Sequence, residues 1–232
     1  MELLARLELG EAVDEPELTG ALRSPHCPAA LVELLVLTSW PRTSRRVARL
    51  LVGHRACPRS FAWEVLPSLG WHDLMEVARG PRTPPAVRRQ AERKLLQKLP
   101  RLTAGERTAL ARSAPRALIE PLLATEDPAC VRALLDNPRF GETDAVRLVH
   151  DNAEARCVLE VVRHRRWGRS RLVLEAALRH PALPLPVAMG LMASAPPAQL
   201  ASVASGEGVP PAVREAAAGL LRHRREREER RD

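Results

Sequence analysis

The chain has 232 residues and a formal net charge of +8, and 45% of its residues are hydrophobic although only 3% are aromatic. This length is enough to bury a sizeable core, but a β-sandwich or β-barrel would use more aromatic and β-branched side chains. Leu, Ala, Arg and Glu are good helix formers, and 21 prolines must interrupt the helices repeatedly. The composition therefore predicts an all-α fold built from many short helices.

The first residues, MELLARLELGE, carry acidic side chains where a secretion signal needs a basic segment followed by an apolar one. The long uncharged run over residues 181–206 contains five prolines, so it cannot form the apolar helix of about 20 residues that crosses a membrane. The cysteines are isolated and typical of small buried apolar residues in a reducing compartment: Cys27, Cys57, Cys130 and Cys157. We therefore expect a cytoplasmic protein without a membrane segment, metal or other cofactor.

Arginine supplies nearly all of the positive charge, since the only lysines are Lys94 and Lys98. This preference also fits the codon usage of a GC-rich genome, which weakens it as a sign of an anionic partner. The basic excess lies over residues 21–100, whereas residues 1–20 are acidic. A basic stripe of this moderate size is compatible with binding to a polyanion.

One short unit recurs along the chain, in which proline ends one helix and a Ser, Thr or Pro starts the next. It occurs as PHCPAAL (25–31), PRTSRRV (41–47), PRTPPAV (81–87), NPRFGETDAV (137–146) and PALPLPV (181–187). Proline cannot continue a helix but suits its first turn, and a hydroxyl can cap the free N–H groups there. Each unit therefore predicts a turn between two helices.

The segments between these turns have helical periodicity. Apolar residues share one face in three sets: Leu31, Leu34, Leu35 and Thr38; Val87, Ala91, Leu95 and Leu99; and Val158, Val161 and Val162. A pair of such helices cannot bury its apolar face alone, so neighbouring pairs must stack. The pattern predicts a right-handed α-solenoid.

The chain is also similar to itself. At an offset of 126 residues, His54 aligns with His180 and the PPAVR at 84–88 aligns with the PPAVR at 210–214; at 127, Trp40 aligns with Trp167. This predicts an internal duplication of residues 21–99 and 148–222, joined by helices over 100–147. All of these belong to a single domain over 1–222, and residues 223–232 form a charged C-terminal helix end or tail.

The turn pattern resembles the leucine-rich-repeat variant and the broader HEAT-like repeats. The segments LLDNPRF (134–140), RHRRW (163–167) and GVPPAVREAAAGLL (208–221) are similar to segments of uncharacterised helical-repeat proteins of GC-rich bacteria. The resemblance covers most of residues 21–222 and implies an α-solenoid. Some leucine-rich-repeat-variant proteins carry an iron–sulfur cluster, but its clustered cysteines are absent here. One HEAT-like family removes alkylated bases from DNA, and the resemblance to it is one of fold alone.

The run RHRRWGRSR, residues 163–171, raises the question of nucleic-acid binding. We expect Arg163, Arg165 and Arg166 in the last turn of a helix that Gly168 ends, where cations favour the helix dipole. Trp167, like its counterpart Trp40, is expected to be a packing wedge at a corner rather than a base-stacking platform. The alternative is a row of corner arginines that binds phosphates or an acidic protein segment: Arg42, Arg45, Arg46, Arg169 and Arg171. The wider candidate binding surface adds Arg163, Arg165, Arg166, Trp40 and Trp167.

The sequence contains no known catalytic motif, and His54 and His180 are expected to be turn residues because the duplication repeats them. A base-excising site would need an acid among aromatics, and the candidates are Trp63 with Glu64 and Trp71 with Asp73. We therefore expect a non-catalytic scaffold for a protein partner. The alternative is a nucleic-acid-binding protein and, behind it, a DNA-base glycosylase. The sequence names neither the partner nor the oligomeric state.

Overall fold

The computed structural model describes residues 2–230, and over that range the chain forms α-helices and short 3₁₀ helices but no strand. The all-α prediction is therefore confirmed. The chain divides into two compact units, unit 1 over Met1–Leu102 and unit 2 over Thr103–Asp232. Each unit is described by itself.

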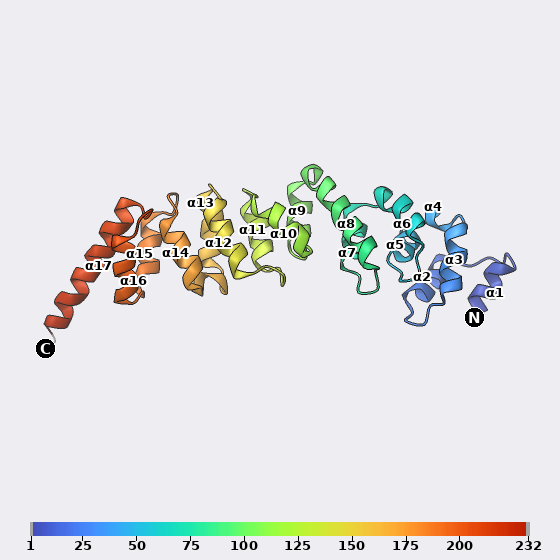
Figure 1. Cartoon of the computed structure of the whole chain (residues 1–232), viewed down its shortest axis with the longest axis horizontal. Coiled ribbons are helices and arrows are strands. Elements are labelled where there is room, and N and C mark those ends of the chain that lie inside the picture. Colours follow the sequence, from blue (N-terminus) through green and yellow to red (C-terminus); the bar gives the residue numbers. More distant parts are fainter. Residues whose placement is uncertain (1, 231–232) are drawn as a thin grey trace. The chain divides into compact units, whose positions relative to one another are not determined.

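Unit 1 contains eight α-helices within its described residues, drawn from blue to green in Figure 1. They are α1 (Glu2–Glu8), α2 (Glu15–Arg23), α3 (Ala29–Leu37), α4 (Trp40–Thr43), α5 (Arg45–Val52), α6 (Arg59–Val65), α7 (Trp71–Arg79) and α8 (Pro85–Lys98). Two 3₁₀ helices follow α6 and α8, η1 (Leu66–Ser68) and η2 (Leu99–Arg101).

Unit 2 contains nine α-helices in the part that the structure describes. They are α9 (Ala104–Ala111), α10 (Arg116–Leu123), α11 (Pro128–Leu135), α12 (Glu142–Asp151), α13 (Ala155–Arg163), α14 (Arg171–Arg179), α15 (Leu185–Ala193), α16 (Pro197–Ser205) and α17 (Pro211–Glu229). A 3₁₀ helix, η3 (Trp167–Arg169), precedes α14. Because α17 runs to Glu229, the charged segment from 223 to 229 is helical as predicted, and residues 231–232 lie outside the described range.

The predicted turns have the expected local chemistry. The turns at 25–31, 81–87, 137–146 and 181–187 separate helices, and Pro85 occupies the first turn of α8, where its missing N–H costs nothing. The turn at 41–47 differs, because Pro41 lies inside the one-turn helix α4. Ser44 then caps α5, accepting a hydrogen bond from the N–H of Val47 at 3.2 Å.

The helical periodicity of the sequence corresponds to buried faces. Val87, Ala91 and Leu95 on α8 are fully buried, whereas Leu99 lies beyond that helix in η2 and is half-buried. On α3, Leu31 and Leu35 are buried, while Leu34 and Thr38 are half-buried. All three valines of α13 are buried, Val158, Val161 and Val162.

Successive helices pack in rows within each unit. In unit 1, α5 packs against α2 and α7, and α8 packs against α7 and α6. In unit 2, α11 lies between α9 and α13, and α12 lies between α10 and α14. In unit 2, α11 and α12 therefore each contact the helix two before and the helix two after them in the chain.

Side chains at helix ends tie these rows together in unit 2. Asn152 Nδ2 donates to the carbonyl of Thr125 at 2.7 Å, and His180 Nε2 donates to the carbonyl of Asn152 at 2.7 Å. We call these three residues, Thr125, Asn152 and His180, the corner ladder. On the other row, Asn137 Nδ2 donates to the carbonyls of Ala111 and Ala114. These bonds satisfy helix-end carbonyls that would otherwise lack partners.

Candidate binding surfaces

A groove of about 630 Å³ opens in unit 1 between α3, α4, α5 and α6. We call it the α3–α6 groove and define it by six of the residues that line it: Leu37, Arg42, Arg45, Phe61, Glu64 and Leu69. Phe61 and Leu69 are buried and form an apolar floor. Leu37 stands at the rim with 84% of its surface exposed. An apolar floor beneath a polar rim is the usual form of a ligand or peptide site.

The turn between α3 and α5 places both arginines of the groove. The hydroxyl of Thr38 donates to the carbonyl of Leu35 at 2.7 Å and accepts from the N–H of Trp40, which ends α3 and starts α4. Arg42 lies on α4, and Arg45 is the first residue of α5. Short-range hydrogen bonds therefore hold both arginines at one rim.

The positive charges of the arginines beside the groove are not neutralised by ion pairs with other described side chains. Among the side chains that the structure describes, Arg42, Arg45 and the adjacent Arg46 form no side-chain hydrogen bond or ion pair, and all three are exposed. By contrast Arg49, one turn further along α5, lies 3.6 Å from Asp73 and 3.7 Å from Glu76. The rim arginines are therefore available to an anionic group of a partner.

Glu64, on α6, adds one carboxylate to the lining of the groove. It forms no ion pair with another residue that the structure describes. The groove is therefore lined by charges of both signs, two guanidinium groups from α4 and α5 and one carboxylate from α6.

The arginine-rich run of unit 2 has a different structure from the one expected. Helix α13 ends at Arg163, so Arg165 and Arg166 lie in the turn beyond it and not in its last turn. The N–H groups of Arg166 and Trp167 donate to His164 Nδ1 instead, which holds the chain in a turn. Gly168 does not end the helix either, because it lies five residues later inside η3.

Gly168 is required by a close backbone approach. A Cβ atom there would lie 2.1 Å from the carbonyl oxygen of Val162, well inside contact distance. Its N–H donates to the carbonyl of His164 at 2.8 Å. The glycine lets η3 fold tightly onto the end of α13.

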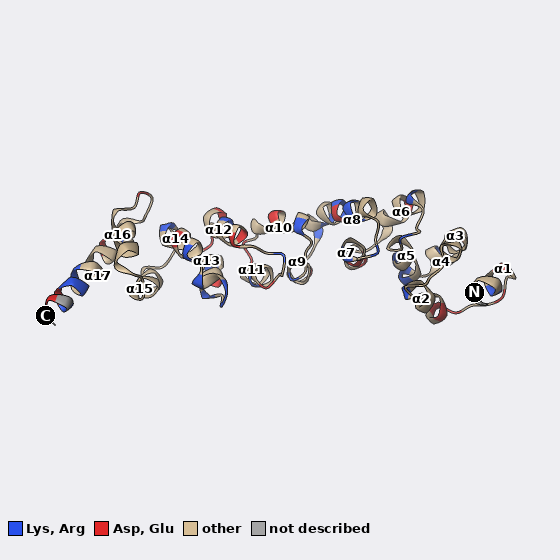
Figure 2. Ribbon diagram, turned by 60° about the horizontal axis from the view of Figure 1, so that its bottom comes forward, with Lys and Arg blue, Asp and Glu red and all other residues tan. Residues whose placement is uncertain are grey.

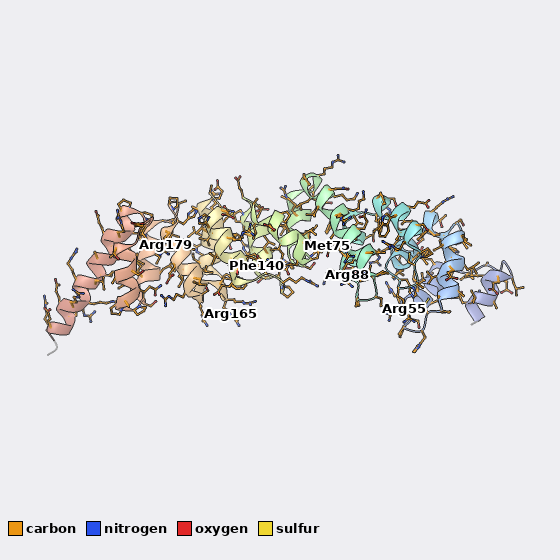
Figure 3. All side chains as sticks on the ribbon, in the orientation of Figure 1. Arg55, Met75, Arg88, Phe140, Arg165 and Arg179 are labelled. Atoms are coloured by element: carbon orange, nitrogen blue, oxygen red, sulfur yellow. The ribbon has the colours of Figure 1, made fainter. Side chains whose placement is uncertain are left out.

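Trp167 is a packing wedge, as predicted. It is 3% exposed, its indole N–H donates to the carbonyl of Leu135 at 3.0 Å, and its ring meets Phe140 edge-on at 5.6 Å. Phe140 lies within the body of unit 2 in Figure 3. The guanidinium of Arg166 lies 4.1 Å from the centre of the Trp167 ring. Because the ring is buried and Arg166 lies over one of its faces, no base could stack on it.

The remaining arginines of the run differ in their surroundings. Arg171 forms an ion pair with Glu175 at 2.7 Å. Arg163, Arg165 and Arg169 are exposed and form no side-chain hydrogen bond or ion pair with another described residue, and Arg165 projects from the ribbon in Figure 3. Basic residues also lie along α8 of unit 1 in Figure 2.

A single row of corner arginines stays a prediction. Unit 1 contains Trp40, Arg42, Arg45 and Arg46, whereas the arginine-rich run belongs to unit 2.

Trp40 is the less buried member of the tryptophan pair. Its ring is half-buried at the start of α4, and it lies beside the α3–α6 groove without lining it. Of the residues that make the groove distinctive, Leu37 and Phe61 were not identified as site residues from the sequence, and Glu64 was considered only as an acid for base excision. The available signal was Leu37, since α3 is apolar on its outward side as well as on its buried face.

Two histidines and two cysteines have contacts or burial typical of structural rather than catalytic residues. His54 Nδ1 accepts from the N–H of Ala56 and His180 Nδ1 accepts from the N–H of Ala182, so both are turn residues as predicted. Burial raises the pKa of Cys57 to about 12 and that of Cys157 to about 11, which keeps both thiols protonated at neutral pH. Over residues 2–230, no group of three or more His, Cys, Asp and Glu side chains could hold a metal ion.

A second cavity, of about 300 Å³, lies in unit 1 at the C-terminal ends of α2, α5 and α7. It is lined by His54, Arg49 and Arg82, among other residues. Arg82 crosses it to donate to the carbonyls of Arg23 and Ser24, both at 2.9 Å. Burial lowers the pKa of His54, and the positive charges of Arg55 and Arg82 lower it further.

The acids proposed for base excision also have defined neighbours. Asp73 is ion-paired with Arg49, and Glu64 lies in the wall of the α3–α6 groove. Trp63, beside Glu64, is 39% exposed, and the Arg59 guanidinium lies 5.4 Å from its ring centre. These residues therefore do not form one cluster of an acid enclosed by aromatic rings.

Comparison with known protein families, with curated proteins and with solved structures finds no match to this chain. None of the helices that the structure describes combines the length and the apolar character needed to cross a membrane.

Proposed function

We propose that the chain is a non-catalytic helical-repeat scaffold, an α-solenoid with two related halves, that binds a protein partner. Support for the repeat comes from the helix starts. Helices α3, α5, α6, α7 and α8 begin 126 residues before α13, α14, α15, α16 and α17, as with Arg45 and Arg171. Equal spacing over five successive pairs is what duplication of an ancestral segment would leave. The four buried cysteines suit a reducing compartment, and we place the protein in the cytoplasm.

The observation that carries the binding role is the α3–α6 groove. It joins an apolar floor to two arginines that have no partner among the described residues, a combination enriched in protein–protein contacts. The two tryptophans at the corners do not supply exposed rings for stacking on bases, since Trp167 is buried and Trp40 is half-buried. A protein segment therefore suits this surface better than a nucleic acid does.

The proposal can be tested by site-specific photo-cross-linking. Leu37 is replaced by p-benzoylphenylalanine at the groove rim, and Leu9, which is 76% exposed outside the groove, carries the same replacement as a control. After irradiation in an extract of the source cells, adducts are identified by mass spectrometry. We expect peptides of a second protein attached at position 37 and absent at position 9. Attached nucleotides at position 37, or identical adducts at both positions, would refute a protein-binding role.

A second candidate function is nucleic-acid binding, which the exposed arginines without partners favour, notably Arg163, Arg165 and Arg169. Fluorescence anisotropy with labelled single- and double-stranded DNA and RNA separates the two functions. A protein that contacts several phosphates loses affinity by about three orders of magnitude or more between about 50 and about 200 mM salt. Replacement of Arg42, Arg45 and Arg46 together by Ala would flatten that slope. A protein scaffold shows no such steep dependence.

A further inference from the structure

We infer that the α3–α6 groove binds an acidic protein segment that inserts one apolar side chain into the groove and places its carboxylates against Arg42 and Arg45. This inference rests on the proposed function and deepens it by naming the chemistry of the partner. It also predicts the orientation of the bound segment, because the arginines of the groove come from α4 and α5 and its carboxylate comes from α6.

The apolar part of the recognition comes from the floor and the exposed leucine. Ala48, Phe61 and Leu69 are each less than a tenth exposed and form the bottom of the hollow, and Leu37 stands above them almost fully in water. A side chain the size of Leu or Phe that entered the groove would cover Leu37 and contact the floor together. Removing this apolar surface from water favours binding. The volume of about 630 Å³ is in the ordinary range for a site that takes a few side chains.

The acidic part of the recognition comes from three sources of positive potential at one rim. Arg42 and Arg45 line the groove and form no ion pair with another side chain that the structure describes, and Arg46 follows directly. Arg45 also begins the eight-residue helix α5, so the positive end of the helix dipole adds to the two guanidinium groups. A planar guanidinium can hold a carboxylate through two parallel hydrogen bonds.

Glu64 sets the orientation of the segment and argues against a polyanion. It faces the groove from α6, so phosphates that ran the length of the hollow would approach its carboxylate. The floor also offers a single aromatic ring, that of Phe61, which is 9% exposed and cannot present a face to a base. The acidic end of the segment therefore lies against the arginines, and a neutral or basic residue lies against Glu64.

The test uses the full chain and a panel of short fluorescein-labelled peptides. In each peptide a Leu, Phe or Ala follows a short run of Asp and Glu residues and precedes neutral residues, and binding is followed by fluorescence anisotropy. We expect the Leu and Phe peptides to bind at least about tenfold more tightly than the Ala peptide, a difference of about 1.4 kcal/mol. A peptide with Lys in place of every Asp and Glu should not bind.

Protein variants locate the site. The double variant Arg42→Glu with Arg45→Glu and the single variant Leu37→Asp should each weaken binding of the Leu peptide by about tenfold or more. Arg89→Glu on α8 is the matched control, since Arg89 is exposed and lies outside the groove, and it should leave binding unchanged. All of these positions are exposed, and thermal melting by circular dichroism verifies that each variant folds.

The outcomes separate this inference from the proposed function. Equal binding of the Leu and Ala peptides, indifference to both groove variants, or no binding of any peptide overturns the inference. If a protein adduct still forms at position 37 in those cases, the scaffold role survives without it. An oligonucleotide that binds more tightly than the peptides and depends on Arg42 and Arg45 but not on Leu37 overturns both.

Discussion

The two tryptophan corners have nearly the same sequence and different structures. WPRTSRR in unit 1 and WGRSR in unit 2 each contain a tryptophan, a single helical turn, a serine that caps the next helix and an arginine at its first position. In unit 2 the ring is buried and hydrogen-bonded, whereas in unit 1 it is half-buried beside an open groove. A shared motif therefore specifies the turn without specifying whether the corner is closed.

The residue after each tryptophan explains the difference. Gly168 approaches the carbonyl of Val162 so closely that no side chain fits, and its N–H bonds to His164. The corresponding residue in unit 1, Pro41, has a ring in place of that hydrogen atom and has no N–H to donate. One more residue also separates Trp40 from its capping serine. In unit 1, Pro41 forms part of the groove wall.

Replacement of Trp167 by Ala should cause the largest loss in the free energy of unfolding. Trp167→Ala leaves a cavity and an unpaired carbonyl at Leu135, and we expect it to lower the free energy of unfolding by about 3–5 kcal/mol in urea titrations. Trp40→Ala should cost about half as much or less, because its ring is half-buried. Equal losses would mean that the two corners are closed to the same degree.

The next effect concerns the glycine that closes the unit 2 corner. Gly168→Ala forces a Cβ atom against the carbonyl of Val162, and we expect a loss of about 1–3 kcal/mol in the free energy of unfolding. Gly190→Ala on α15 is the matched control, since no atom lies within 4 Å of the added carbon. That variant should be stabilised by about 0.5–1 kcal/mol through helix propensity. A neutral Gly168→Ala variant would contradict the close approach.

His180 in unit 2 and His54 in unit 1 show the same difference between a closed site and an open one. His180 is locked to the carbonyl of Asn152, while the equivalent His54 borders the 300 Å³ cavity. His180→Ala leaves that carbonyl unpaired, and its expected cost is about 1–3 kcal/mol in thermal or urea unfolding. His54→Ala should cost less, because its turn bond to Ala56 is the contact that is lost.

The smallest effect is a pH dependence at His54. Its pKa in the folded chain is lowered from 6.5, first by burial and then by Arg55 and Arg82, so the unfolded chain takes up the proton first. Neutral His54 therefore makes its full contribution to the free energy of unfolding above pH 6.5. That contribution is lost as the pH falls through 6.5 toward the pKa of His54 in the folded chain. His54→Asn keeps an acceptor for the turn and removes the titration, so unfolding curves of the two proteins should converge as the pH falls. A difference in the free energy of unfolding between the two proteins that grows as the pH falls would contradict a lowered pKa of His54.

Residues whose role is local were predictable from the sequence. Proline and hydroxyl positions located the helix ends, the spacing of Val87, Ala91 and Leu95 gave the buried face of α8, and Trp167 was expected to be a wedge. Arg165 and Arg166 were placed wrongly, because His164 captures two backbone N–H groups and ends the helical hydrogen bonding early. Such competition between a side chain and the backbone depends on geometry that helix propensity does not report.

The groove could not be predicted because it depends on contacts between separate segments. Leu37 and Phe61 lie on different helices, and only the packing of α3 near α6 around the α4 turn leaves a hollow between them. The arginines were identified by type and position, whereas the floor that gives them a binding role was not. Apolar residues read from the sequence are assigned to the core by default, so an apolar surface that stays open is the feature such reasoning misses.

The corner ladder has a consequence for how this chain can vary in length. Each rung joins a side chain to a carbonyl 27 or 28 residues earlier, so the rungs measure the chain between them. An insertion or deletion between two rungs would move the donor away from its acceptor and leave both buried groups unpaired. Turns outside the rungs carry no such requirement, and Gly208, with nothing near its missing side chain, lies in one of them. The ladder thus fixes the length of chain between Thr125, Asn152 and His180 while the amino-acid composition of unit 2 changes.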